Sequence, residues 1–188
     1  MAETFVSELV LGGQKSGKSR HAEARAQAWL AADARHRVVF VATGVAGDAE
    51  MAERIRQHQA DRAQRLPGVA LVEEPRELAR AIEQHSRPDT LVLVDCLTLW
   101  LTQRLMPLGP EPPDTHPGLL IDGLCAAVGA ATGPVVLVSN EIGWGVIPLG
   151  SGVRSFVDTL GRLNQAVAAV CPRVTLVAAG LSIALKTP

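Results

Sequence analysis

The sequence predicts a single α/β domain with a mainly parallel sheet and helices on both faces. Short runs rich in β-branched and other apolar residues alternate with segments long enough for helices, a pattern typical of parallel sheets. Some runs, such as 91–94 and 135–138, are apolar at every position, as strands buried on both faces are. With 188 residues and 47% hydrophobic content, the chain can bury one such core. We therefore expect one domain over residues 1–188.

The individual elements follow from these patterns in chain order. The expected strands are the runs 8–11, 37–42, 69–72, 90–94, 134–138 and 174–178. Segment 154–170 is expected to be an amphipathic helix that ends before Pro172, because its apolar residues recur with helical spacing. Stretch 107–118 contains five prolines and two glycines and therefore predicts a surface loop.

Composition excludes several classes of partner and suggests a compartment. The formal net charge is -1, so no overall positive field exists to hold a nucleic acid or an anionic membrane. No apolar run approaches the roughly 18 residues that a membrane span needs. Cys96, Cys125 and Cys171 contain no C-x-x-C pair and are interpreted as core residues of a protein from a reducing compartment. We expect a cytoplasmic protein whose partners are small molecules or further subunits.

A phosphate-binding loop is the most specific motif in the chain. Residues 12–19 match G-x-x-x-x-G-K-[ST], follow the first strand and open a helix, as P-loop nucleotide-binding proteins require. Roughly 0.002 matches are expected by chance in a chain of this composition. The residues expected to surround the phosphates are Gly12, Gly13, Gln14, Lys15, Ser16, Gly17, Lys18 and Ser19.

Three side chains are expected to complete this site chemically. Lys18 is expected to contact the β- and γ-phosphates, and the hydroxyl of Ser19 is expected to bind Mg²⁺. Asp95 closes the apolar run 91–94, where P-loop proteins place the acid that holds Mg²⁺ or its water. An Asp at the end of a strand is common, so this assignment depends on the loop.

The fifth predicted strand is followed by residues suited to ligand contacts. Asn140 and Glu141 lie just after it, where open α/β sheets bind ligands at the carboxyl ends of their strands. Trp144 follows in the same turn and is interpreted as a packing aromatic residue.

A histidine in a locally basic segment leaves two interpretations open. Met51, Ile55 and His58 share one helical face, so His58 could simply be a half-buried residue of a packed helix. The arginines around it would also suit a triphosphate.

These motifs together resemble one family, the bifunctional adenosylcobinamide kinase/adenosylcobinamide-phosphate guanylyltransferases of cobalamin biosynthesis. The resemblance runs in order along almost the whole chain. It is carried by residues 12–20 (GGQKSGKSR), 41–43 (VAT), 54–58 (RIRQH), 72–75 (VEEP), 94–101 (VDCLTLWL), 139–145 (SNEIGWG) and 161–165 (GRLNQ).

The resemblance implies a RecA-like P-loop fold, a homotrimer and a guanylylated histidine at His58. It implies two reactions: phosphorylation of adenosylcobinamide by ATP or GTP, and transfer of GMP from GTP onto that phosphate. It further implies nucleotide contacts outside the loop at Ala42, Thr43, Gly44, Gln59, Ala60, Asp61, Arg62, Glu73 and Asp95.

Gln14 and Lys15 stand where the family usually has a small residue and an arginine, and the loop pattern is preserved. Two alternatives remain open from sequence. The chain could be a kinase of another small metabolite, or a RecA-like module that binds a protein or nucleic acid. Aromatic residues make up only 3%, which disfavours nucleic-acid stacking.

Overall fold

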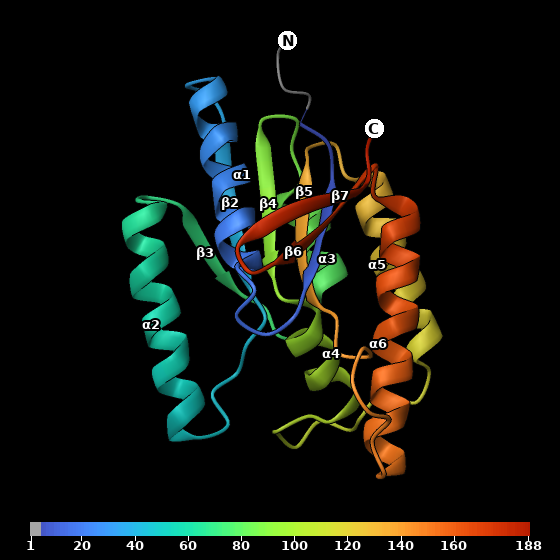
Figure 1. Ribbon diagram of the computed structural model, residues 1–188. Helices are drawn as coiled ribbons and strands as arrows, with labels where there is room; N and C mark the ends of the chain where they lie inside the picture. Colours follow the sequence, from blue (N-terminus) through green and yellow to red (C-terminus); the bar gives the residue numbers. More distant parts are fainter. Residues whose placement is uncertain (1–4) are drawn as a thin grey trace.

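A seven-stranded sheet forms the centre of the molecule, which is a computed structural model describing residues 5–188. The strand order is β3-β2-β4-β5-β1-β6-β7. All neighbours pair in parallel except β6 and β7, which pair antiparallel (Figure 1). The strands are β1 (Glu8–Gly12), β2 (Arg37–Ala42), β3 (Ala70–Glu73), β4 (Thr90–Asp95), β5 (Val135–Asn140), β6 (Arg173–Ala178) and β7 (Leu181–Lys186).

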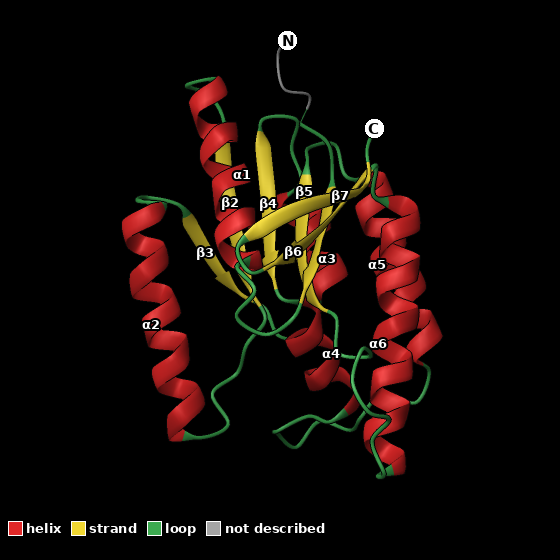
Figure 2. Cartoon of the chain, in the orientation of Figure 1, coloured by secondary structure: helices red, strands yellow, loops and turns green. Residues whose placement is uncertain are grey.

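Helices cover both faces of this sheet (Figure 2). They are α1 (Lys18–Ala32), α2 (Ala49–Arg65), α3 (Leu78–His85), α4 (Leu97–Leu105), α5 (Pro117–Ala130) and α6 (Ser151–Val170). Alternate strand residues point to opposite faces, so Leu9 packs with α3 to α6 whereas Val10 packs with α1. The predicted mainly parallel α/β fold with helices on both faces is confirmed.

The predicted strands agree with the structure, with small shifts at their ends. The strand expected over 134–138 continues to Asn140, which brings two more residues to the carboxyl edge of the sheet. The strand β7 was not among the predicted runs. All six of its residues are exposed, and it follows β6 after the tight turn at Ala179 and Gly180.

The predicted C-terminal boundary of the loop 107–118 is wrong. Pro117 and Gly118 form the first turn of α5, because a proline at the first helical position loses no hydrogen bond and already has a helical φ. The helix predicted over 154–170 is α6, which begins three residues earlier at Ser151 and ends as expected at Val170.

The cysteines are structural, as interpreted. Cys96 and Cys171 are buried, Cys125 is half-buried, and all three are free thiols. Burial raises the pKa of Cys96 and of Cys171 to about 12, so both thiols stay protonated and unreactive. Within residues 5–188, no helix is long and apolar enough to cross a membrane.

Candidate functional site

The glycine-rich loop joins β1 to α1 at the carboxyl edge of the sheet. An added Cβ at Gly12 would lie 2.3 Å from the carbonyl oxygen of Val177, so only glycine fits where β1 meets β6. Gly17 has φ +105 at the N-cap of α1, a conformation that disfavours any larger residue. These glycines turn the chain into the first turn of α1, whose backbone N–H groups then face a ligand.

Polar side chains inside this loop are arranged for an anion. Lys18 is only 7% exposed, and its Nζ donates a hydrogen bond to the carbonyl oxygen of Gly13 at 2.6 Å. The hydroxyl of Ser16 is buried and has no hydrogen-bond partner among residues 5–188. Because an unsatisfied buried hydroxyl is costly, a ligand such as a phosphate oxygen would stabilise it. The loop therefore fits the triphosphate predicted from its sequence.

Oxygen donors suited to Mg²⁺ lie on either side of this loop. Ser19 stands in the first turn of α1, and Asp95 ends β4, two strands away from β1; both side chains are partly exposed. One hydroxyl and one carboxylate are the few protein ligands that Mg²⁺ takes when phosphates and water complete its shell. Within residues 5–188, no group of three His, Cys, Asp or Glu side chains could hold a metal by itself. The donor set thus fits a metal shared with a nucleotide.

The end of β2 is tied to the end of β4 beside Asp95. The hydroxyl of Thr43 donates to the carbonyl oxygen of Cys96 at 2.7 Å and accepts from its N–H at 2.8 Å. Thr43 is fully buried, so a ligand at this point would meet its main chain and the neighbouring Gly44. An added Cβ at Gly44 would lie 3.3 Å from Leu99, which leaves little room for a larger residue.

The C-terminal part of α2 places Arg62 over the sheet. Its guanidinium lies 4.0 Å from the centre of the Phe40 ring. Burial lowers the pKa of Arg62, and the carboxylates of Glu23, Asp95 and Glu73 oppose that shift. Arg62 therefore remains positively charged, and it lies close to Asp95, the carboxylate expected to bind Mg²⁺.

The other residues of α2 that were predicted to contact the nucleotide fall into two groups, those close to Glu73 and those exposed to solvent. Gln59 faces β3, where its side-chain amide donates to the Glu73 carboxylate at 3.3 Å. Ala60 and Asp61 are exposed. Asp61 pairs only loosely with Arg65, at 3.8 Å. The structure brings Gln59, Arg62 and Glu73 together, and leaves Ala60 and Asp61 outside that group.

His58 is an exposed residue in the middle of α2. Within residues 5–188, its ring makes no hydrogen bond or ion pair, so the interpretation of His58 as a half-buried packing residue is wrong. The helix is anchored at its C-terminal end, where Leu66 enters the core and Arg65 forms an ion pair with the buried Glu23. An accessible imidazole on such a helix is free to act as a nucleophile.

A second group of polar residues lies at the end of β5, which sits between β1 and β4. Asn140 is bonded through its backbone N–H and its amide to the hydroxyl of Thr98. Asn164, on α6, bonds the main chain of Asn140 and the side chains of Ser139 and Glu141. The sequence predicted Asn140 and Glu141 at the carboxyl edge of the sheet. It could not predict their contact with Asn164, because that contact depends on how α6 packs against the sheet.

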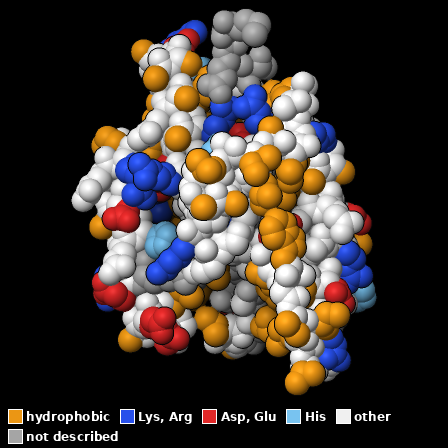
Figure 3. All heavy atoms as spheres, in the orientation of Figure 1, with side chains coloured by type: hydrophobic (Ala, Val, Ile, Leu, Met, Phe, Trp, Pro, Cys, Tyr) orange, Lys and Arg blue, Asp and Glu red, His pale blue; other side chains and the backbone are white. Residues whose placement is uncertain are grey.

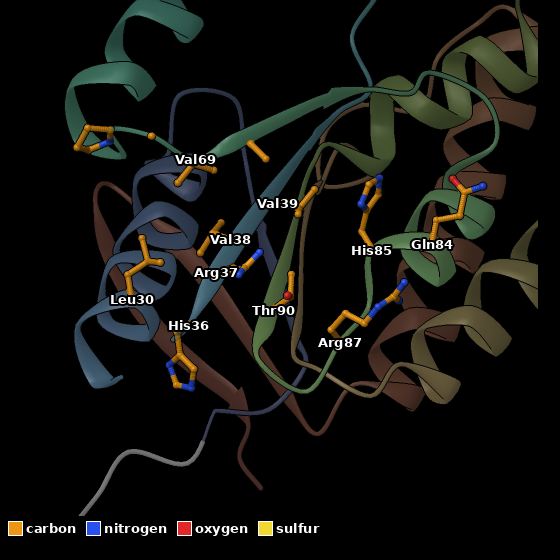
Figure 4. Close-up of a pocket in the computed structure, with 13 residues that line it drawn as sticks. Leu30, His36, Arg37, Val38, Val39, Val69, Gln84, His85, Arg87 and Thr90 are labelled. Atoms are coloured by element: carbon orange, nitrogen blue, oxygen red, sulfur yellow. The ribbon is translucent and has the colours of Figure 1, made fainter. Parts of the chain in front are cut away.

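A hollow of about 450 Å³ lies far from this chemistry (Figure 4). Its lining comes from the amino-terminal ends of β2 and β4 and from the end of α3, including His36, His85 and Thr90. The phosphate loop is at the opposite, carboxyl edge of the sheet. We therefore place the functional site at the loop and not in this hollow.

Fold and loop together define a P-loop nucleotide-binding protein. Two solved structures show the same fold. A protein from Pyrococcus horikoshii matches with a TM-score of 0.55 and 12% identity, over 97% of this chain and 86% of its own. The flagellar accessory protein FlaH from Methanocaldococcus jannaschii matches with a TM-score of 0.53 and 11% identity, over 97% of this chain and 78% of its own.

Sequence comparison then narrows the class to one family. A family model described as "Cobinamide kinase / cobinamide phosphate guanyltransferase" matches residues 8–185. A Pseudomonas aeruginosa relative, "Bifunctional adenosylcobalamin biosynthesis protein CobP", is 44% identical over 95% of this chain and 96% of its own length. The relative named CobU from Salmonella typhimurium is 37% identical over 95% of this chain and 98% of its own length. The chain belongs to the cobinamide kinase/cobinamide phosphate guanyltransferase family, as the resemblance predicted.

Proposed function

We propose that the chain phosphorylates adenosylcobinamide with ATP or GTP and then transfers GMP from GTP onto the new phosphate. Adenosylcobinamide-GDP and pyrophosphate are the products of the second reaction. The observation that carries this proposal is the loop of residues 12–19, built to hold a triphosphate, in a member of this family. Neither alternative from the sequence, a kinase of another metabolite or a binding module, is favoured by the family match.

The loop would hold the triphosphate for both reactions. Backbone N–H groups of the first turn of α1 would bind phosphate oxygens, and Lys18 would exchange its bond to Gly13 for the β- and γ-phosphates. Ser19 and Asp95 would hold Mg²⁺, which when bound supplies positive charge to the departing phosphate group. Arg62 adds a further cation at the same edge of the sheet.

His58 would carry the guanylyl group between the two substrates. An imidazole nitrogen attacks the α-phosphorus of GTP, a nitrogen–phosphorus bond forms, and pyrophosphate leaves with the electron pair of the broken bond. A phosphate oxygen of the corrinoid then attacks the same phosphorus and releases the imidazole. The exposure of His58 supports this role, since a nucleophile that serves two large substrates must be accessible.

The remaining residues of the carboxyl edge would contact the guanine nucleotide. We assign this role to the main chain at Ala42, Thr43 and Gly44 and to the side chains of Gln59, Arg62 and Glu73, with Ala60 and Asp61 at the margin. The hydrogen bond between Gln59 and Glu73 supports the grouping, because it brings α2 and β3 to one place.

Labelling with GTP tests this function directly. The protein is incubated with Mg²⁺ and GTP labelled at the α-phosphate, and is then separated by denaturing electrophoresis. We expect covalent label that peptide mass spectrometry maps to His58. Absence of label, or label on His21, His36, His85 or His116, would contradict the proposed mechanism.

We also propose that one domain of residues 1–188 carries both reactions in the cytoplasm and assembles as a homotrimer. Three free cysteines support a reducing compartment. Exposed apolar side chains on β7, at Leu181, Ile183 and Leu185, support a neighbouring subunit. Hydrophobic side chains gather over this part of the molecule in Figure 3. The mass in solution, measured by light scattering, tests the trimer.

A further inference from the structure

The carboxyl end of β5 adjoins the phosphate loop. Gly12 and Asn140 are paired across the β1–β5 ladder. The next residue, Glu141, donates a hydrogen bond from its backbone N–H to the carbonyl oxygen of Gly12 at 3.1 Å. Because β5 lies between β1 and β4, Glu141 stands at the edge shared by the loop and Asp95. A second acidic residue is thus held beside the phosphate loop.

The side chain of Glu141 is held in place from α6. Asn164 is only 4% exposed, and its amide donates to Oε1 of Glu141 at 3.2 Å and to the carbonyl oxygen of Asn140 at 3.1 Å. Its own amide oxygen accepts from the Ser139 hydroxyl at 2.7 Å, which fixes which end of the amide faces Glu141. One carboxylate oxygen is therefore oriented by a buried residue.

This arrangement has an electrostatic cost that a structural role does not explain. Glu141 is partly exposed and forms no ion pair with any residue of 5–188. An anion fixed beside an anion-binding loop opposes phosphate binding. A carboxylate next to a transferring phosphoryl group is useful when it accepts a proton from the attacking hydroxyl.

The chain that follows Glu141 suits a large acceptor better than water. Ile142, Trp144, Val146, Ile147 and Leu149 are 42%, 75%, 97%, 75% and 98% exposed. The interpretation of Trp144 as a packing residue is therefore wrong for this chain. Hydrophobic side chains also gather around the start of α6, the end of this loop, in Figure 3. So much exposed apolar surface in one loop marks a binding region.

We propose that Glu141 is a catalytic residue of the kinase reaction, the group that takes the proton from the acceptor's hydroxyl. This assignment rests on the proposed function. The hydroxyl oxygen forms a bond to the γ-phosphorus, and the bond from that phosphorus to the β-phosphate oxygen breaks. The nucleoside diphosphate leaves with the electron pair of the broken bond, and the hydroxyl proton moves to the Glu141 carboxylate. The apolar loop 142–149 carries the corrinoid that bears this hydroxyl.

The test separates the kinase reaction from guanylylation. Glu141→Gln should lower kcat for phosphorylation of adenosylcobinamide on the order of 10²-fold. Covalent labelling of His58 by GTP, measured without any corrinoid, should stay within about twofold of the wild type, because that step has no hydroxyl to deprotonate. Glu83→Gln, an exposed carboxylate on α3, is the matched control and should change neither.

Two further variants keep the test decisive. Glu141→Asp retains the charge and should recover part of the lost kcat, and it replaces Glu141→Gln if that variant does not fold. Trp144→Ala should raise KM for adenosylcobinamide and leave labelling by GTP unchanged.

Three outcomes would overturn the assignment of Glu141. These are normal kinase turnover in Glu141→Gln, equal loss of kinase and labelling at unchanged Tm, or an Asp variant no better than Gln. Failure of the wild type to phosphorylate adenosylcobinamide would instead overturn the proposed function.

Discussion

Single residues in the loop and on α2 should separate the two reactions. In the proposed function Lys18 would hold the triphosphate in both reactions, whereas His58 would serve only guanylyl transfer. Lys18 could be singled out from sequence because the motif that contains it is continuous in the chain. The exposure of His58 could not, since Met51, Ile55 and His58 share a helical face whether or not that face is packed.

We expect Lys18→Ala to lower both kinase turnover and guanylylation by on the order of 10² or more. The reason is that the buried ammonium neutralises charge that develops on the phosphates in each transition state. Both rates are measured with saturating acceptor. Lys186→Ala, which removes a lysine hydrogen-bonded to main-chain carbonyls of α6, is the control and should leave both rates unchanged.

We expect His58→Ala to abolish covalent labelling by GTP and formation of the GDP-linked product, while kinase activity continues. Because His58 is exposed and forms no hydrogen bond or ion pair with the part of the chain that the structure describes, the Tm of the variant should match that of the wild type within about 1 °C. The wild-type adduct should be labile in acid and stable in base, because protonation turns the phosphoramidate nitrogen into a good leaving group. Joint loss of stability and both activities would show a structural histidine instead.

At the scale of elements, α2 is attached to the molecule by its C-terminal end. Besides the ion pair between Arg65 and Glu23, the side-chain amide of Gln27 donates to the Arg65 carbonyl oxygen at 2.6 Å. These contacts join α2 to α1, the helix that follows the phosphate loop. The position of His58 relative to the loop therefore depends partly on these contacts with α1, beside those of Gln59 with Glu73 and of Arg62 with Phe40.

We expect Arg65→Ala to destabilise the protein by about 1–2 kcal/mol, because it leaves the carboxylate of Glu23 buried without its cation. Guanylylation should fall with it, because α2 loses its ion pair with α1, although it keeps the bond from Gln27 to its main chain. Arg56→Ala breaks an exposed pair with Glu53 on the same helix and should cost less than about 0.5 kcal/mol. Urea unfolding measures the loss of unfolding free energy in each variant. Equal losses would argue against the ion pair of Arg65 and Glu23 as the contact that holds α2.

Elements were predictable where their signal was local. The runs 91–94 and 135–138 became central strands because a short run that is apolar at every position is typical of a strand covered on both faces. The strand β7 was missed although Leu181, Ile183 and Leu185 alternate with period two and its apolar content equals that of β6. Only Ala179 and Gly180 separate it from β6, so the sequence does not mark it clearly as a separate element. The start of α5 was missed because proline and glycine were counted as loop residues without regard to helix position.

At the scale of the whole molecule, Glu8 joins three elements inside the core. It is only 1% exposed on β1 and meets His21 and Arg25 of α1 and Thr175 of β6. Burial alone would raise the pKa of Glu8. Hydrogen bonds from His21 and Thr175, with the charge of Arg25, outweigh burial and lower it. None of these contacts is local, so neither Glu8 nor the Glu141 site could be assembled from sequence.

Because the folded-state pKa of Glu8 is lowered, its contribution to stability is complete above the unfolded-state value of about 4.3. That contribution is lost as pH falls through the lower folded-state pKa. We expect Glu8→Gln to lose about 1–3 kcal/mol at pH 7 and to show a flatter acid decline than the wild type. Urea unfolding at several pH values between 7 and 3 measures this, and parallel declines would exclude Glu8 as the cause.

The antiparallel direction of β7 has a practical consequence. Because β7 runs back against β6, the chain leaves the sheet at the edge where β1 begins, and the end of β7 lies away from the loop in Figure 1. A tag, fluorophore or surface linker fused after β7 would therefore lie on the side remote from the phosphate loop. Protein immobilised through such a handle should still turn its reactive edge toward the solution.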